Sequence, residues 1–151
     1  MMPTIPITKD WKELLEFLNA NQVKYLVVGG VALGCYVAPR YTGDIDIFIE
    51  ASAENAKRML RALDDFGFGS VGITEADLTG DDMIIQLGYP PNRIDFMTKI
   101  SGVEFEEAWN NKVVEKIHEL QVNLISKNDL LKNKLASGRP KDLADADSLN
   151  K

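Results

Sequence analysis

The chain has 151 residues, of which 45% are hydrophobic and 26% are charged, and this composition excludes a disordered chain. The length fits one domain over residues 1–151, which can bury a hydrophobic core without disulfides. The net charge is −6, from 17 basic and 23 acidic residues. Binding of an extended nucleic acid is therefore not favoured, because it usually requires a basic face.

The spacing of apolar residues predicts alternating helices and strands in the first half of the chain. A helical periodicity gives way to a short apolar run that stops at Gly29-Gly30, and an alternation of polar and apolar residues begins at Asp44. Ser52 has the side chain of a helix N-cap. The expected elements are a helix over residues 8–21, a strand over 24–28, a helix over 31–38, a strand over 44–50 and a helix from 52 to about 66.

In the second half, Pro90-Pro91-Asn92 separates two strand-like runs and predicts a hairpin. Ser126 resembles a capped helix start, Gly138 suits a helix end, and Pro140 suits the first turn of a last helix. The expected elements are strands over 83–89 and 93–98, a helix over 104–110, strands over 112–117 and 121–125, and helices over 126–138 and 140–149. This order favours an α+β fold, with helices packed against a mixed β-sheet.

No signal peptide or membrane-spanning segment is expected. The first six residues lack a basic start and an apolar run. The most apolar stretch, residues 25–39, is shorter than the ~20 residues that a spanning helix needs, and two glycines interrupt it. The single cysteine, Cys35, cannot form an internal disulfide. These features predict a cytoplasmic protein without a membrane partner.

Three aspartates carry the main chemical signal. Asp44 and Asp46 alternate with isoleucines along one expected strand, so both carboxylates point to the same face and repel each other. Asp95, in the later hairpin strand, could lie beside this pair or form a salt bridge with a nearby basic residue. Mg²⁺, or Mn²⁺ in its place, would offset the repulsion because it prefers carboxylate oxygens. On an edge strand, the pair could instead simply face water.

Gly29-Gly30 ends an apolar strand and begins a helix. Glycine lets the backbone approach a ligand closely, and a helix start offers free N–H groups and a positive dipole end. These glycines could hold a triphosphate or simply form a strand-to-helix turn. Combined with the three aspartates, they match two-metal phosphoryl transfer, in which one ion positions the triphosphate and the other activates the incoming hydroxyl.

The stretch Gly29-Gly30-Val31-Ala32, followed by Arg40-x-Thr42-x-Asp44-x-Asp46, resembles the signature of the DNA polymerase β-like nucleotidyltransferase superfamily. With the segment from Asn133 to Asp145, it is similar to a minimal prokaryotic branch related to abortive-infection (AbiEii-type) toxin nucleotidyltransferases. The resemblance implies a transferase that moves a nucleoside monophosphate from an NTP to a hydroxyl acceptor and releases pyrophosphate. The alternative is a non-catalytic binding or regulatory module of the same fold, including one half of a toxin–antitoxin pair.

The resemblance also implies roles for individual residues. Asp44, Asp46 and Asp95 would hold two Mg²⁺ ions and carry catalysis, with Asp95 as general base. The nucleotide would be bound by Gly29, Gly30, Arg40, Thr42, Lys134, Arg139 and Lys141. The last three could instead lie at solvated helix ends, where cations offset the helix dipole. Asp142 and Asp145 could orient Arg139 or Lys141. Because no further helical domain follows to complete the site, the acceptor could be bound by a partner protein or a second copy of the chain.

Overall fold

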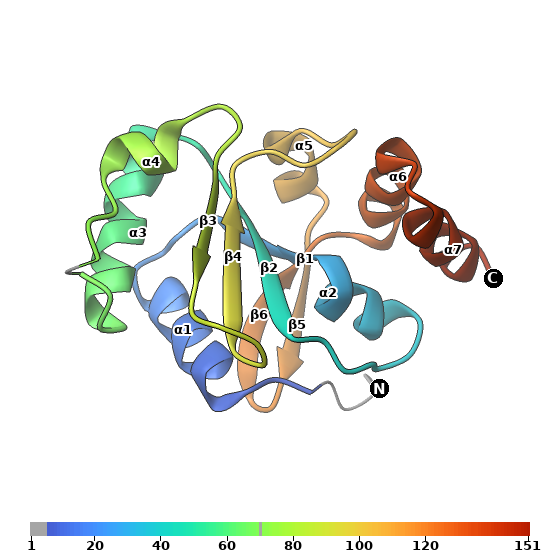
Figure 1. The fold of residues 1–151 in the computed structure, drawn as a ribbon, viewed down its shortest axis with the longest axis horizontal. Coiled ribbons are helices and arrows are strands. Elements are labelled where there is room, and N and C mark those ends of the chain that lie inside the picture. Colours follow the sequence, from blue (N-terminus) through green and yellow to red (C-terminus); the bar gives the residue numbers. More distant parts are fainter. Residues whose placement is uncertain (1–5, 70) are drawn as a thin grey trace.

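The computed structural model describes residues 6–69 and 71–151 and contains a six-stranded mixed sheet with helices on both faces (Figure 1). The helices are α1 (Lys9–Ala20), α2 (Gly29–Tyr36), α3 (Ala53–Asp65), α4 (Glu75–Thr79), α5 (Phe105–Asn110), α6 (Lys127–Ser137) and α7 (Pro140–Leu149). The strands are β1 (Tyr25–Val28), β2 (Asp44–Ile49), β3 (Ile84–Leu87), β4 (Arg93–Met97), β5 (Val113–Ile117) and β6 (Leu120–Leu124). The predicted α+β class with a mixed sheet is confirmed.

The strand order is β3-β4-β2-β1-β6-β5. β2 pairs with β1 in the antiparallel direction and with β4 in the parallel direction, so the end of β1 and the starts of β2 and β4 meet at one edge. The register pairs Asp46 with Val28 on one side and with Asp95 on the other. Since α2 begins directly after Val28, the register brings the acids next to the start of that helix.

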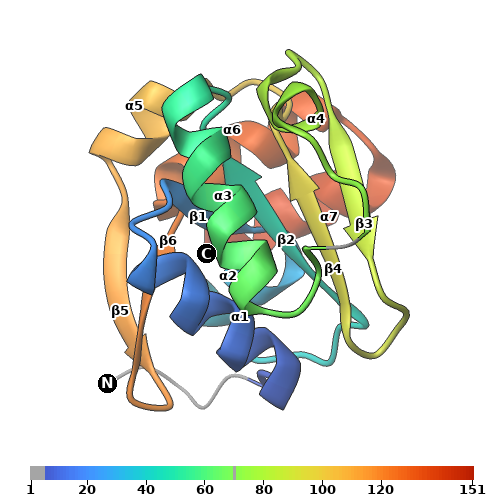
Figure 2. The ribbon, with the colours of Figure 1, turned by 90° about the vertical axis from the view of Figure 1, so that its left-hand side faces the viewer.

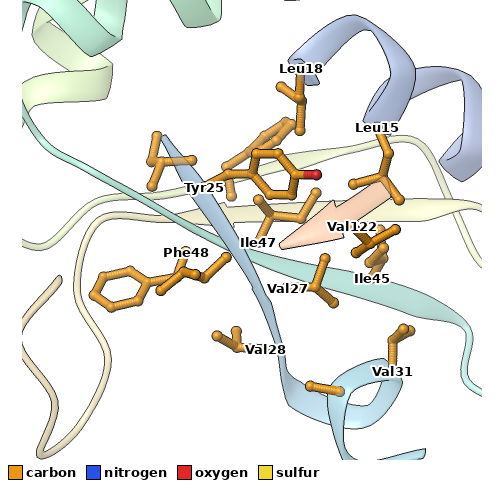
Figure 3. Close-up of a cluster of buried hydrophobic side chains, with 14 of the residues drawn as sticks. Leu15, Leu18, Tyr25, Val27, Val28, Val31, Ile45, Ile47, Phe48 and Val122 are labelled. Carbon is orange, nitrogen blue, oxygen red and sulfur yellow. The ribbon is translucent and has the colours of Figure 1, made fainter. Parts of the chain in front are cut away.

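The core lies between the sheet and α1 with α3, which cover one face, whereas α2, α6 and α7 lie on the other (Figures 1 and 2). Figure 3 shows Ile45 and Ile47 of β2 among side chains that include Leu15 of α1. All three are fully buried, and burial of one such side chain contributes about 1.5–3 kcal/mol. Because side chains alternate along a strand, this anchoring turns Asp44 and Asp46 toward the opposite face.

Each element predicted from the sequence is present, with ends shifted by a few residues. The helix expected from residue 31 begins at Gly29, directly after β1. The short helix α4 was not predicted, although Thr74 and Asp77 form a capping box at its start. It has five residues and buries only Leu78, which is too little for a helical periodicity. Among the described residues, no helix is long and apolar enough to cross a membrane.

Candidate active site

Three aspartates converge at the edge of the sheet where β2 and β4 begin. One carboxylate oxygen each from Asp44, Asp46 and Asp95 can be chosen so that all three atoms lie within 4.8 Å of one another. The parallel pairing aligns Asp46 with Asp95, and Asp44 lies two residues earlier on the same face of β2. The expected position of Asp95 beside the pair is confirmed, whereas the roles of these acids stay predictions.

Arg93 lies among these acids and was not predicted as a site residue. Its Nε and Nη2 atoms donate to the two carboxylate oxygens of Asp95, each at 3.1 Å, and Nη2 also donates to Asp44 at 3.1 Å. Both alternatives considered for Asp95 therefore hold, since it lies beside the pair and is bound to a basic residue. Arg93 precedes Asp95 by two residues on β4, so strand alternation was a usable sequence signal.

The acids crowd each other enough to change their protonation. Burial, and next the negative charges of Asp44 and Asp95, raise the pKa of Asp46 to about 7, although the charge of Arg93 acts in the opposite direction. Burial also raises the pKa of Asp95, against the hydrogen bonds and charge of Arg93. The guanidinium of Arg93 thus neutralises only part of the negative charge of the three aspartates. A set of carboxylate oxygens with uncompensated negative charge suits Mg²⁺ or Mn²⁺.

Thr42 and Gly29 determine the positions of the two acids on β2. The Thr42 hydroxyl contacts the carbonyl oxygen of Asp44 and accepts a hydrogen bond from its N–H group at 3.2 Å. Gly29 has a φ of +64°, and a Cβ atom added there would lie 2.1 Å from Oδ2 of Asp46. The structure therefore requires glycine where the start of α2 passes the acidic cluster.

A cavity of about 860 Å³ opens over this edge of the sheet. Asp44 and Asp46 line it, whereas Asp95 does not, because its carboxylate is buried and held by Arg93. The predicted nucleotide-binding residues all line the same cavity: Gly29, Gly30, Arg40, Thr42, Lys134, Arg139 and Lys141. Part of the lining was not predicted, and it includes Asp82, Ile84, Met97, Lys99, Ile100 and Ser101. Isolated apolar or charged residues of this kind carry no recognisable sequence signal.

A family model described as "Nucleotidyltransferase of unknown function (DUF6036)" matches residues 6–150. The chain belongs to this nucleotidyltransferase family. No curated protein matches the sequence at a significant level.

Two solved structures are similar to this nucleotidyltransferase. The lincomycin-bound lincosamide antibiotic adenylyltransferase LnuA has a TM-score of 0.57 and 16% sequence identity, with 99% of each chain covered. An antigenic nucleotidyltransferase-like protein from Paracoccidioides brasiliensis has a TM-score of 0.53 and 19% identity, with coverage of 95% of this chain and 77% of the other. At such identities the likeness shows the fold alone.

In this nucleotidyltransferase, acids hold the basic residues of the cavity wall. Nζ of Lys134 lies 3.3 Å from Asp142 and 3.2 Å from Asp145. Arg40 donates to both oxygens of Asp145, at 3.3 Å each, and Arg139 donates to Asp142 at 2.6 Å. Burial raises the pKa of Asp142, but hydrogen bonds from neighbours including Arg139 and Lys134 outweigh it and lower the pKa to about 2.

This network changes the predictions made for the C-terminal helices. Lys134 is buried, so it does not lie at a solvated helix end. The predicted contact between Asp142 and Arg139 is present, and the orienting role of Asp142 stays a prediction. Asp145 contacts neither of its expected partners and binds Arg40 and Lys134 instead. Lys141 is exposed, and no ion pair involves it among the described residues.

Replacing Gly29 with alanine should destabilise the nucleotidyltransferase and displace Asp46. Alanine at positive φ costs roughly 1–2 kcal/mol, and the overlap with the Asp46 carboxylate should add about 1–3 kcal/mol. Chemical denaturation measures the change. Gly67→Ala is the matched control, because Gly67 has a φ of +97° and open space around the added Cβ. Equal destabilisation by the two substitutions would contradict a close approach between Gly29 and Asp46.

Proposed function

We propose that this chain is a metal-dependent nucleotidyltransferase that moves a nucleoside monophosphate from an NTP to a hydroxyl group and releases pyrophosphate. The observation that carries the proposal is the convergence of three carboxylates within 4.8 Å beside the start of α2. Family membership supports nucleotide transfer in general. The description of LnuA as an adenylyltransferase supports ATP as the first NTP to test.

The residues around the acids fit a bound Mg²⁺–NTP complex. Asp44, Asp46 and Asp95 would hold two Mg²⁺ ions, which would neutralise phosphate charge and make the incoming hydroxyl more acidic. The free N–H groups at the start of α2, from Gly29 and Gly30, would bind phosphate oxygens. We call four basic residues of the cavity lining the basic wall, namely Arg40, Lys134, Arg139 and Lys141. The basic wall would bind the leaving pyrophosphate.

The proposed reaction is a displacement at the α-phosphorus. The acceptor oxygen bonds to that phosphorus, the bond to the bridging oxygen of the β-phosphate breaks, and pyrophosphate leaves with the electron pair. Asp95 would accept the hydroxyl proton, and burial, which raises its pKa, makes it a stronger base. Arg93 would fix the orientation of Asp95 without preventing this, because each carboxylate oxygen can accept a second hydrogen bond.

Thermal shift with Mg²⁺ and each of the four NTPs tests the proposal. A ligand at 100 times its Kd adds about 2.7 kcal/mol, so the preferred NTP should raise the Tm by roughly 5–10 °C, and EDTA should abolish the shift. No shift with any NTP would refute the proposal. A shift without pyrophosphate release, in the presence of a cell extract that supplies acceptors, would instead identify the nucleotide-binding module considered as the alternative.

The relation to abortive-infection toxins is a narrower proposal. It is supported by the motif between Asn133 and Asp145, whose lysine, arginine and two aspartates form the ion-pair network of the cavity wall. The neighbouring genes provide the test. A small helical or DNA-binding protein encoded next to this chain would support a toxin–antitoxin pair and a protein partner, and an isolated gene would count against both.

A further inference from the structure

The part of the cavity over β3 and β4 has no role in the proposed function. Ile84 of β3 and Met97 of β4 are paired in the antiparallel register, and both line the cavity together with Ile100. We name Ile84 and Met97 the apolar shelf, whereas Ile100 lies beyond β4 in a loop that is hydrogen-bonded to α6. Ile84 is 64% exposed, so the shelf presents a large apolar side chain to the cavity rather than to the core.

The order of the strands places the apolar shelf opposite the phosphate-binding side. Gly29 and Gly30 follow β1, the acids lie on β2 and β4, and the shelf lies on β4 and β3. Met97 follows Asp95 by two residues on β4, so both side chains belong to the same face of the sheet. The acids therefore separate the start of α2 from the shelf.

The geometry of phosphoryl transfer constrains where the acceptor can bind relative to the leaving pyrophosphate. The attacking and leaving oxygens lie roughly in line on opposite sides of the phosphorus. The proposed function, on which this step rests, places pyrophosphate beside α2 and the basic wall. The acceptor must then approach from β3 and β4. We propose that the apolar shelf is the acceptor subsite, and that the acceptor is a small hydroxyl-bearing molecule with an apolar face.

The charges and the size of the cavity favour a small acceptor over a nucleic acid. A polynucleotide needs several basic residues to neutralise its phosphates. Near the shelf, the cavity is lined by one basic residue, Lys99, and one acidic residue, Asp82. No ion pair involves either of them among the described residues, and their opposite charges leave no net positive charge there. The cavity volume of about 860 Å³ lies within the range of roughly 300–1,000 Å³ that is typical of small-molecule sites.

The test follows label from an α-³²P-labelled NTP into acceptors. The full chain is incubated with Mg²⁺ and the NTP that gives the largest thermal shift, together with a cell extract separated into small-molecule, RNA and protein fractions. The label should enter a compound of the small-molecule fraction. Label in RNA or protein alone, or no labelled small molecule although Mg²⁺–NTP binding persists, overturns the inference and leaves the nucleotide site intact. Absence of NTP binding refutes the proposed function itself.

A substitution on the shelf then tests the position of the subsite. Ile84→Asp should lower kcat/KM for the labelled acceptor by about tenfold or more, while the Kd of the NTP stays unchanged and Ile84→Leu retains activity. Val114→Asp is the matched control, because Val114 is also exposed on an edge strand, β5, and does not line the cavity. An unchanged kcat/KM in Ile84→Asp, or an equal loss in both variants, would refute the subsite.

Discussion

Asparagine in place of Asp44 or Asp95 should reduce nucleotide transfer by roughly a thousandfold or more. Metal ions stabilise the charge of a phosphoryl-transfer transition state by several kcal/mol, and about 4 kcal/mol corresponds to that factor. Asparagine has nearly the same shape as aspartate and lacks the negative charge that strengthens the binding of a divalent ion. Its amide oxygen still accepts a hydrogen bond from Arg93, so the fold should persist in both variants.

The measurement is the transfer of label from an α-labelled NTP into an extract, with melting curves to establish that each variant is folded. Asp147→Asn is the control, because Asp147 is exposed on α7 and, within residues 6–69 and 71–151, forms an ion pair only with Lys151. Its activity should equal that of the unmodified chain. Retained transfer in folded Asp44→Asn or Asp95→Asn would refute the role proposed for that residue.

Asp46→Asn should make the metal-free protein more stable at pH 8. The pKa of Asp46 is about 7 in the folded chain, compared with 3.8 for an ordinary aspartate. The folded state therefore binds this proton more tightly than the unfolded state does. The contribution of Asp46 to the free energy of unfolding should be highest below about pH 4 and should fall by up to roughly 4 kcal/mol as the pH rises to 7. Asparagine removes this loss because it carries no charge.

Melting curves in EDTA from pH 5 to pH 8 test this expectation. At pH 8 the Tm of Asp46→Asn should exceed that of the unmodified chain by several degrees, since 1 kcal/mol corresponds to about 2–4 °C at this chain length. The difference should narrow at pH 5, and Mg²⁺ should stabilise the unmodified chain more than the variant. Asp147→Asn should change little at any pH. If Asp46→Asn is no more stable than the unmodified chain at pH 8, the burial and charge repulsion that raise the pKa of Asp46 are contradicted.

The positions of two of the three acids could be predicted from the sequence because polar and apolar residues alternate along their strand. Ile45 and Ile47 mark the buried face of β2, so the positions of Asp44 and Asp46 follow from alternation alone. The parallel pairing with β4 has no local signal, since strands far apart in sequence pair through the fold as a whole. The convergence of Asp95 with the other two acids was therefore a hypothesis until the register was known.

Other parts of the site could not be predicted, because the exposure or burial of their side chains depends on the tertiary structure. The alternation of polar and apolar residues does not predict the exposure of Ile84, because this exposure results from the edge position of β3 in the sheet. Lys134 reads as a surface residue in a polar helix, yet it is buried because α7 brings Asp142 and Asp145 against it. The helical periodicity of α6 contains no information about α7, so the ion pairs of Lys134 with these two acids were not predicted.

The salt bridge from Arg40 to Asp145 joins residues 105 positions apart. Translation produces the acids of β2 and β4 and the start of α2 well before it reaches Asp142 and Asp145 on α7. A nascent polypeptide that stops short of this helix has the cluster of aspartates but lacks the counter-charges that hold Arg40 and Lys134 in the cavity wall. The complete nucleotide site can therefore assemble only after Asp142 and Asp145 of α7 have been synthesised.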